Sequence, residues 1–328
     1  MEKVDIYEKA ITTTFRRFLW SKFLKAVKEY NLIRDGDKIC VCISGGKDSM
    51  VLAKLFMCLE KFMSDMHFEV KYLVMNPGYN KKNLDLIKKN LKTLHIPAEI
   101  RETNIFEVAY MQDKSPCFLC AKMRRGALYN IAKSMGCNKI ALGHHYDDVI
   151  ETTLMNMLSS GSFQTMLPKL KSTNYEGMEL IRPMYYIREK DIIRFAKVNN
   201  LEFIQCACKF TEEYKNSDDG IGESRRAYIK DLIKKISKEI PDVEKNLFNA
   251  PNNVTADMIL GYKKGGVYHS YLDEYDDDLV SFAESINSID AGKPSDKAKQ
   301  IMKLYDDGII DFETAEFAIT RLHSRKNK

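Results

Sequence analysis

The segment Lys38-Ile-Cys-Val-Cys-Ile43, followed at once by Ser44-Gly-Gly-Lys-Asp-Ser49, carries the clearest structural signal in the sequence. Its first six residues are an apolar run of the kind that forms a buried parallel strand. Residues 50–62, which follow the glycines, have the apolar spacing of a helix. A strand that leads through a tight turn into a helix is the first half of a βαβ unit. The segment therefore predicts an α/β protein.

The same alternation continues along the chain. We expect further strands at residues 69–75, 98–102, 138–142, 180–182 and 202–205. We expect further helices at residues 7–30, 82–94, 118–135, 148–158, 188–198 and 223–248. This order predicts a doubly wound parallel sheet, with an N-terminal helix and a helical C-terminal extension. Because ligands bind beyond the carboxyl ends of such strands, we expect Ser44–Gly46 and Gly143–His145 to face one cleft.

The composition narrows the class of protein. The 328 residues are 45% hydrophobic and 30% charged, which is ordinary for a globular chain and argues against global disorder. The 51 basic and 46 acidic residues leave a net charge of +5, which is too small to establish nucleic-acid binding. No apolar run reaches the roughly 18–20 residues of a membrane helix, and the first residues lack an apolar signal core. We expect a cytoplasmic protein with no membrane partner.

The loop Ser44–Ser49 has the composition of an anion-binding turn. Two glycines let the backbone turn tightly and bring its N–H groups close to an anion. The helix N-terminus, Lys47 and the two serine hydroxyls add positive charge and donors. The glycine spacing matches neither Gly-x-x-x-x-Gly-Lys-Ser/Thr nor Gly-x-Gly-x-x-Gly. On these residues alone, phosphate binding is favoured only modestly over a Gly-Gly turn with a helix cap.

Eight cysteines in an intracellular chain indicate metal, cluster or catalytic thiols rather than disulfides. Four lie in apolar stretches and are most simply core residues, namely Cys40, Cys42, Cys58 and Cys137. Cys117 and Cys120 begin a predicted helix beside the basic pair Arg124-Arg125, a setting that lowers thiol pKa values. Alone, this Cys-x-x-Cys fits zinc, a redox disulfide or an iron–sulfur cluster, and Cys206 and Cys208 could supply further ligands.

The hexapeptide Ser44–Ser49 resembles the PP-loop of the ATP pyrophosphatases, which cleave ATP to AMP and pyrophosphate while adenylating a substrate oxygen. Four other segments look like the tRNA 2-thiocytidine synthetase branch of that superfamily: residues 117–126, 141–148, 181–184 and 188–193. The match runs from about residue 10 to about residue 255, with the motifs in the order of the family. It implies a helical lead-in at 1–34, a PP-loop domain at 35–210, a helical RNA-facing region at 211–260 and a C-terminal extension at 261–328.

The resemblance also implies site residues. Lys47 and Asp48 would be catalytic, with Asp48 also on Mg²⁺. The implied ATP-binding set is Ser44, Gly45, Gly46, Lys47, Asp48, Ser49, Asn76, Gly143, His144 and Asp147. Cys117, Cys120 and Cys206 would be catalytic ligands of a 4Fe–4S cluster that leaves one iron free to bind sulfur. Relatives often have Cys-x-x-Cys where this chain has Cys206-Ala-Cys208, and of the two we favour Cys206.

Two positions depart from the pattern of the family. Tyr146 stands where relatives often have Arg, and Asn76 stands where they frequently have Asp. The RNA backbone would be bound by basic residues spread over three segments, which are Arg124, Arg125, Lys169, Arg225 and Arg226. For the segment around Lys169, a plain basic surface loop is the alternative.

The leading interpretation is an ATP-dependent tRNA sulfurtransferase that adenylates the C2 oxygen of cytidine 32 and replaces it with sulfur. It would use ATP, Mg²⁺ and a 4Fe–4S cluster. Its partners would be tRNA and a cysteine desulfurase or another sulfide donor, and we expect a homodimer. One alternative is a PP-loop thiolase that acts on uridine or on a small molecule. Another is a non-catalytic nucleotide-binding or zinc-structural module.

Overall fold

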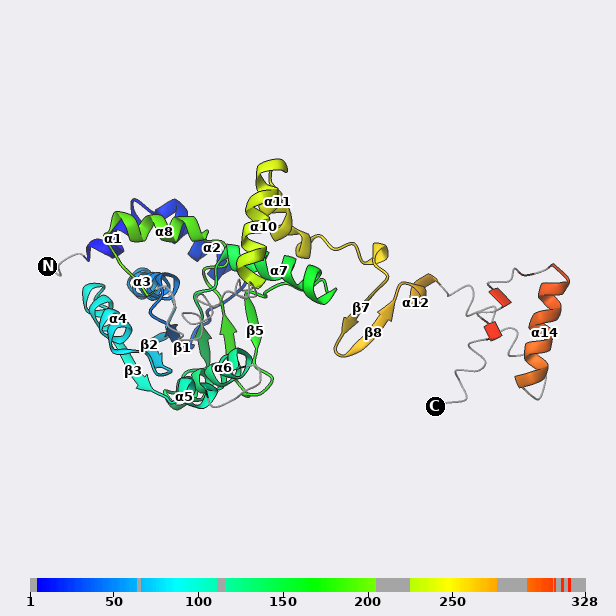
Figure 1. Ribbon diagram of the computed structural model, residues 1–328, viewed down its shortest axis with the longest axis horizontal. Helices are drawn as coiled ribbons and strands as arrows, with labels where there is room; N and C mark the ends of the chain where they lie inside the picture. The colour runs from blue at the N-terminus through cyan, green and yellow to red at the C-terminus, as the bar shows by residue number, and fades with distance from the viewer. Residues whose placement is uncertain are drawn as a thin grey trace. The chain divides into compact units, whose positions relative to one another are not determined.

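The computed structural model describes residues 5–63, 66–110, 116–204, 225–275 and 294–308, together with 310, 314, 315, 318 and 319. The chain divides into two units, Met1–Asn252 and Asn253–Lys328. The first unit is an α/β structure built on one six-stranded sheet, and Figure 1 shows its elements in chain order. Over the residues described, no helix has the length and apolarity needed to cross a membrane.

The sheet of the first unit has the strand order β3-β2-β1-β4-β6-β5. The strands are β1 (Lys38–Ile43), β2 (Glu69–Asn76), β3 (Ala98–Glu102), β4 (Lys139–Ala141), β5 (Lys169–Lys171) and β6 (Glu179–Ile181). Five run parallel, and only β5 pairs antiparallel, at the edge beside β6. The strand order reverses between β1 and β4, which is the switch point where such sheets bind ligands. The predicted doubly wound α/β fold is confirmed.

Helices cover both faces of this sheet. They are α1 (Ile6–Thr12), η1 (Arg16–Trp20), α2 (Ser21–Glu29), α3 (Lys47–Phe62), α4 (Lys81–Thr93), α5 (Ile105–Tyr110), α6 (Pro116–Ser134), α7 (Tyr146–Ser160), α8 (Glu189–Val198), α10 (Arg225–Glu239), α11 (Val243–Asn249) and η2 (Ala250–Asn252). Figure 1 shows α1, α3 and α8 on one face and α5 and α6 on the other. Both faces of β1 are therefore covered, which explains its continuous apolar run.

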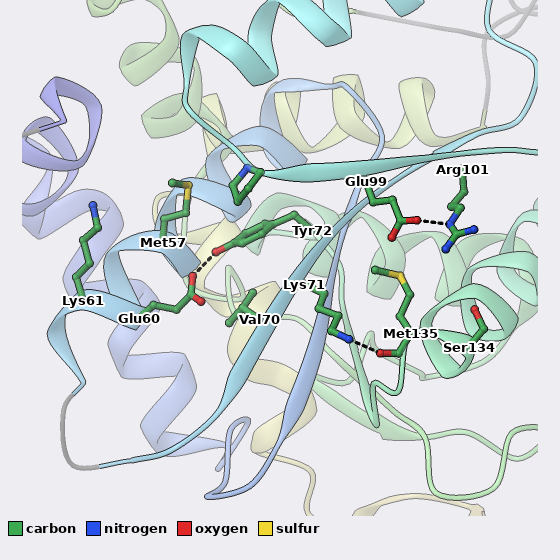
Figure 2. Close-up of a pocket in the computed structure, with 11 residues that line it drawn as sticks. Met57, Glu60, Lys61, Val70, Lys71, Tyr72, Glu99, Arg101, Ser134 and Met135 are labelled. Atoms are coloured by element: carbon green, nitrogen blue, oxygen red, sulfur yellow. Dashed lines mark hydrogen bonds and ion pairs between the residues drawn. The ribbon is translucent and has the colours of Figure 1, made fainter.

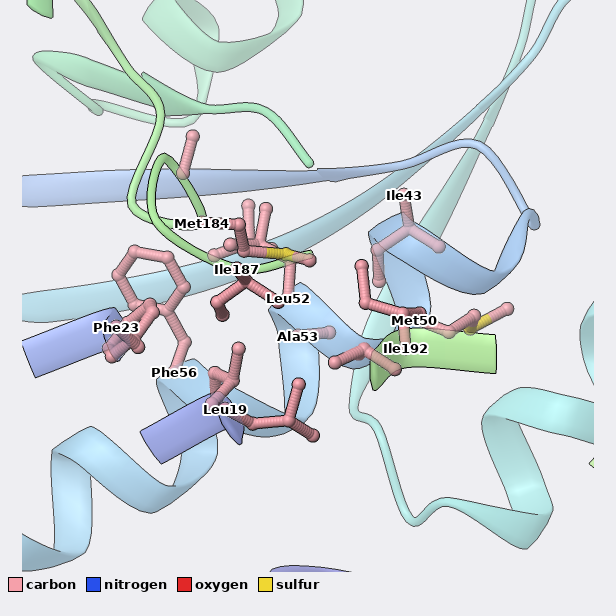
Figure 3. Close-up of a cluster of buried hydrophobic side chains, with 14 of the residues drawn as sticks. Leu19, Phe23, Ile43, Met50, Leu52, Ala53, Phe56, Met184, Ile187 and Ile192 are labelled. Carbon is pink, nitrogen blue, oxygen red and sulfur yellow. The ribbon is translucent and has the colours of Figure 1, made fainter. Parts of the chain in front are cut away.

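The side chains of β1 alternate between two cores. Ile39, Val41 and Ile43 join the larger core, while Cys40 and Cys42 join a smaller one on the opposite face. In the larger core, the N-terminal helices pack on α3, and Figure 3 shows Phe23 against Phe56, whose rings meet edge to face at 5.6 Å. The four cysteines predicted to be core residues, Cys40, Cys42, Cys58 and Cys137, are all buried, so that prediction is confirmed.

Two of the predicted long helices are broken. The segment 7–30 forms α1, the π-helical turn η1 and then α2. Thr12 and Thr13 cause the first break, because their hydroxyls bind the carbonyls of Glu8 and Lys9 and compete with the helical backbone. The segment 223–248 is interrupted between α10 and α11 by Pro241, which lacks an N–H, and by Asp242 at a φ of +60°.

The strand predicted at 202–205 is wrong for its described residues. Residues 201–204 form no strand and instead cross near α4, where Asn90 donates to the Glu202 carbonyl at 2.7 Å. The segment around Lys169, for which a surface loop was the alternative, contains the short edge strand β5. Cys206, Cys208 and the end of the predicted strand lie outside the described residues.

The second unit holds a β-hairpin, which the predicted helical C-terminal extension did not include. Its elements are η3 (Ala256–Met258), β7 (Gly261–Lys264), β8 (Val267–Ser270), α12 (Leu272–Tyr275) and α14 (Pro294–Asp306). Gly265 and Gly266 make the turn, with φ values of +60° and +87°, and a Gly-Gly pair is a known hairpin signal. The side chains of Ile301, on α14, and Ala315 are buried in one small cluster.

Candidate active site

The loop between β1 and α3 is shaped by Gly45, which has a φ of +87°. A Cβ atom there would lie 2.5 Å from Ile87 Cγ1, so any other residue would displace that side chain. The Ser49 hydroxyl closes the loop, because it accepts the Ser44 N–H at 3.1 Å and donates to the Gly46 carbonyl at 2.9 Å. No side chain of the described residues caps α3, so the N–H groups of its first turn can bind an anion.

The loop between β4 and α7 packs directly on the first turn of α3. A Cβ atom at Gly143 would lie 3.1 Å from the carbonyl carbon of Asp48 and from the nitrogen of Ser49, both of them backbone atoms. His145 then begins α7 with a reciprocal cap, in which each backbone N–H of His145 and Asp148 donates to the side chain of the other. These contacts bring the two glycine-containing loops together at the switch point.

Lys47 and Asp48 form the start of a chain of ion pairs. Lys47 Nζ lies 3.1 Å from Asp48 Oδ2 and 3.0 Å from Glu189 Oε1, and Glu189 also pairs with Lys230. Burial raises the pKa of Glu189, but the bonds from Lys230 and Lys47 outweigh it and lower that pKa to about 2. For Asp48, burial raises the pKa and its attraction to His145 and Lys47 offsets this only in part.

Three buried side-chain atoms around this site have no hydrogen-bond partner among the described residues. They are Asp48 Oδ1, His144 Nδ1 and Arg182 Nε. Burial lowers the pKa of His144 to about 4, so its ring is neutral at pH 7. Because buried polar atoms are almost always paired in folded proteins, unpaired atoms at the start of α3 and just after β4 and β6 indicate polar ligands at this edge of the sheet.

Comparison with known proteins identifies the family to which this arrangement belongs. Residues 17–217 match the profile of the PP-loop domain. The chain belongs to the PP-loop family. A tRNA-cytidine(32) 2-sulfurtransferase from Geotalea uraniireducens is 35% identical over 240 residues, which are 72% of this chain and 91% of that protein. A protein of the same name from Geobacter sulfurreducens is 33% identical over 72% of this chain and 89% of its own.

Among solved structures, the U34-tRNA thiolase from Methanococcus maripaludis, determined with its 4Fe–4S cluster, shares the fold. It aligns with a TM-score of 0.55 at 20% identity and covers 79% of this chain and 87% of its own. The sequence relatives place the chain in the tRNA-cytidine(32) 2-sulfurtransferase branch of the PP-loop family. The family that the motifs predicted is confirmed.

The PP-loop is buttressed by the turn after β2. Asn76 Oδ1 accepts the N–H groups of Gly78 at 3.0 Å and Tyr79 at 2.7 Å, and its Nδ2 donates to Glu102 at 2.6 Å. Tyr79 in turn donates its hydroxyl to the Ser44 carbonyl at 3.1 Å. Asn76, expected among the ATP-binding residues, thus uses its amide to build the turn that supports the PP-loop.

The predicted ATP-binding residue Asp147 is likewise engaged within the protein. Its carboxylate accepts the Glu189 N–H at 2.7 Å and lies 3.0 Å from Arg188, so it fixes the start of α8. Beside it, the ring of Tyr146 stacks on Phe248 at 4.1 Å, with the Arg188 guanidinium 4.8 Å from its centre. A cation therefore lies next to the position at which relatives often carry Arg.

The thiols lie on α6, of which Cys117 and Cys120 occupy the first turn. Cys120 is half-buried. Burial raises the pKa of Tyr79, and two nearby residues of α6 act on it as well, since Arg124 lowers this pKa and Cys120 raises it. This puts the start of α6 near the turn that supports the PP-loop. The side chain of Cys117 and the whole of Cys206 lie outside the described part of the chain, so the proposed ligand set stays a prediction.

The basic residues predicted to bind RNA are not all at this site. Arg226 reaches it, with its guanidinium 2.8 Å from Asp148 Oδ1. Arg125 and Arg225 are exposed, and Arg124 is half-buried. Lys169 instead pairs with Glu179 at 3.3 Å and donates to the Asn31 carbonyl at 2.9 Å, so it is bound at the start of β6.

Sequence reasoning missed Glu189, Lys230 and Arg182 as residues of this site. Arg182 was the last residue of the strand predicted at 180–182 and stood in the recognised motif 181–184, and that position was the available signal. A cavity of about 600 Å³ lies elsewhere, at the amino ends of the strands, where Tyr72 donates to Glu60 at 2.6 Å (Figure 2). Its walls come from β2, β3 and the ends of α3 and α6, and they include no residue of the PP-loop.

Proposed function

We propose that this protein is an ATP-dependent tRNA sulfurtransferase that adenylates the C2 oxygen of cytidine 32 and replaces it with sulfur. The observation that carries the proposal is the relationship to tRNA-cytidine(32) 2-sulfurtransferases over most of the chain. The local geometry supports it, because the PP-loop leads into an uncapped helix start and Asp48 Oδ1, in that first turn, is buried without a hydrogen-bond partner among the described residues. ATP would bind there, with its phosphates at the first turn of α3.

The residues of the PP-loop would act on the departing pyrophosphate. The N–H groups at the start of α3 and the Lys47 ammonium would bind the negative charge that develops on it during adenylation. The unpaired Oδ1 of Asp48 suits a divalent cation, since Mg²⁺ takes one or two carboxylates together with phosphate oxygens. Mg²⁺ would neutralise phosphate charge when bound there.

Cys117, Cys120 and Cys206 would hold a 4Fe–4S cluster, which would carry the sulfur from a donor on its free iron. The position of Cys120 fits this role, because it is half-buried in the first turn of a helix near Arg124. A helix N-terminus and a neighbouring guanidinium both favour the thiolate form that ligates iron. We further propose that a cysteine desulfurase or another sulfide donor delivers the sulfur, and that the enzyme is cytoplasmic and a homodimer.

The RNA would bind with its target base unstacked, because the active-site groups cannot reach the C2 atom of a stacked base. An anticodon loop allows this at low cost. The exposed Arg125 and Arg225, with Arg124, would bind its phosphates. In this proposal the PP-loop domain spans 35–210, and the helical lead-in 1–34 packs on it. The region 211–260 faces the RNA. The extension 261–328 takes no part in the reaction.

Nucleoside analysis of tRNA from a strain that lacks the gene tests the proposed function. We expect 2-thiocytidine at position 32 to disappear and to return when the wild-type gene is restored, but not when Lys47→Ala is supplied. An unchanged 2-thiocytidine content would contradict the proposal. Loss of a thiolated uridine instead would assign the enzyme to another base.

A further inference from the structure

Arg182 follows β6 directly, and within the described part of the chain its guanidinium lacks the carboxylate partner that such a group usually has. Its Nε atom is buried and, among the described residues, has no hydrogen-bond partner. One terminal nitrogen donates to the Leu167 carbonyl. No carboxylate within the described ranges lies at ion-pair distance from it. Burial lowers the pKa of Arg182 to about 10, so the side chain still carries its charge at pH 7.

The neighbours of Arg182 do not balance this charge. Tyr185 and Tyr129 lie close, but burial raises the pKa of both hydroxyls, so they are neutral at pH 7. Repulsion from Arg125 exceeds the attraction of Asp148, and the Asp148 carboxylate is already bound by Arg226 at 2.8 Å. The side chain is only partly exposed, its Nε atom is fully buried, and no carboxylate of the described residues offsets its charge. An anionic ligand would supply both the missing hydrogen-bond acceptor and the counter-charge.

The position of Arg182 shows which anion it can reach. β6 is separated from β1 by β4, so two strand spacings, or about 10 Å, lie between Arg182 and the end of β1, where the PP-loop begins. The guanidinium also donates to the carbonyl of Leu167, just before the outer strand β5, and this bond holds it on the side of β6 away from β1. Between them lies His144, which follows β4, feels the charge of Arg182 and also has an unpaired buried nitrogen. The anion at Arg182 is therefore separate from the departing pyrophosphate.

We infer that Arg182 binds a second phosphate group of the substrates, on the β4–β6 side of the site, while the PP-loop binds the pyrophosphate. The inference rests on the proposed function, since ATP and tRNA are the two sources of such a group. If the phosphate belongs to the RNA backbone, Arg182 fixes the strand beside the target nucleotide. If it is the α-phosphate of ATP, Arg182 holds the group that is transferred to the base.

The test uses the full-length protein with Arg182→Met and Arg182→Lys, and Arg101→Met as a matched control. Arg101 is an exposed arginine of β3 that pairs with Glu99. Thermal unfolding is measured without ligands, and binding of ATP and of tRNA is measured over a range of salt concentrations. A purely structural Arg182 predicts a lower melting temperature in Arg182→Met. A ligand-binding Arg182 predicts an unchanged or higher one, because an uncompensated buried charge is removed.

In Arg182→Met we expect binding of one substrate to weaken by about 10- to 100-fold, as for a lost hydrogen bond to a charged group. Arg182→Lys should recover part of this loss. If the RNA is the source, the slope of log affinity against log salt becomes shallower by about 1 while ATP binding is unchanged. If ATP is the source, its binding weakens and the RNA slope is unchanged.

The inference is overturned if Arg182→Met binds both ATP and tRNA as tightly as Arg101→Met does, or if its loss of binding tracks a lower melting temperature. These outcomes can be separated from failure of the proposed function. Binding needs no sulfur transfer, so a wild type that binds both substrates but leaves cytidine 32 unmodified contradicts the proposed function alone.

Discussion

The contact between Gly143 and the first turn of α3 gives a test of how tightly the PP-loop must be placed. In Gly143→Ala, the new Cβ would lie 3.1 Å from two backbone atoms of Asp48 and Ser49 and 3.2 Å from the Asp48 carbonyl oxygen. Backbone cannot rotate aside as a side chain does, so the two loops must separate by a few tenths of an ångström. Gly143 has no positive φ, so the effect comes from this contact rather than from backbone strain.

Overpacking of this kind destabilises a fold by about 1–3 kcal/mol. For a unit of this size, that corresponds to a melting temperature lower by roughly 2–12 °C. The effect on catalysis should be larger in proportion, since a shift of about 1 Å in a reacting group can reduce the rate about 100-fold. For a few tenths of an ångström we expect pyrophosphate release to fall by about tenfold.

Pyrophosphate release and thermal unfolding of Gly143→Ala are compared with those of Gly126→Ala. Gly126 lies inside α6, and a Cβ there would lie 3.5 Å from the Tyr175 hydroxyl, which is an ordinary contact. That control should melt at or above the wild-type temperature, because alanine favours helix over glycine. Wild-type rates and melting in Gly143→Ala would show that the two loops do not position one another.

Four further predictions follow from the site and the tail. Lys47→Ala should slow pyrophosphate release by about 100–1,000-fold while the iron content of the reconstituted protein stays unchanged, and normal release would remove the PP-loop from the chemistry. The visible absorbance of the reconstituted cluster should disappear in each of Cys117→Ala, Cys120→Ala and Cys206→Ala. It should persist in Cys137→Ala, because Cys137 lies in the buried core. Persistence in Cys117→Ala would refute the ligand set. The free energy of unfolding lost in Glu189→Gln should be constant above about pH 5 and should shrink as the pH falls from 4.5 towards 2, because the pKa of Glu189 is depressed in the folded state. Urea titrations at several pH values measure this loss. A loss that grows in acid would contradict the lowered pKa. Deleting residues 296–328 should change melting or oligomeric state but preserve ATP cleavage, and loss of tRNA binding by a folded truncation would make the tail part of the substrate surface.

The sequence predicted the five parallel strands, because each is an apolar or alternating run next to a helix with apolar residues at helical spacing. The clearest of them, β1 and β2, have six and eight residues and are the most buried of the long strands. β5 has only Lys169, Leu170 and Lys171, and it forms because β6 offers an open edge. Nothing local marks such a strand. The breaks at Thr13 and Pro241 and the Gly265-Gly266 hairpin did have local signals, in hydroxyls, a missing N–H and a glycine pair.

The residues of the candidate site also fall into those that the sequence predicted and those that it did not. The PP-loop is contiguous in sequence and was found from its glycines, its lysine and its place after a strand. Glu189, Lys230 and Arg182 were missed because their roles arise from tertiary packing, which pairs α8 with both α3 and α10 and leaves Arg182 without a carboxylate among the described residues. A sequence pattern can show that a residue is charged, but it cannot show which charge lies beside it.

The strength of these ion pairs explains how the PP-loop can be rigid and still accept ATP. Its backbone is fixed by Gly45, Gly143 and the Ser49 hydroxyl, in contacts that involve buried or backbone atoms. The pairs that Lys47 makes are different, since its side chain is 28% exposed and that of Glu189 is 18% exposed. Pairs with access to water are weaker than fully buried ones. Lys47 can exchange the Glu189 carboxylate for a phosphate, because its charge then keeps an anionic partner and Glu189 keeps Lys230.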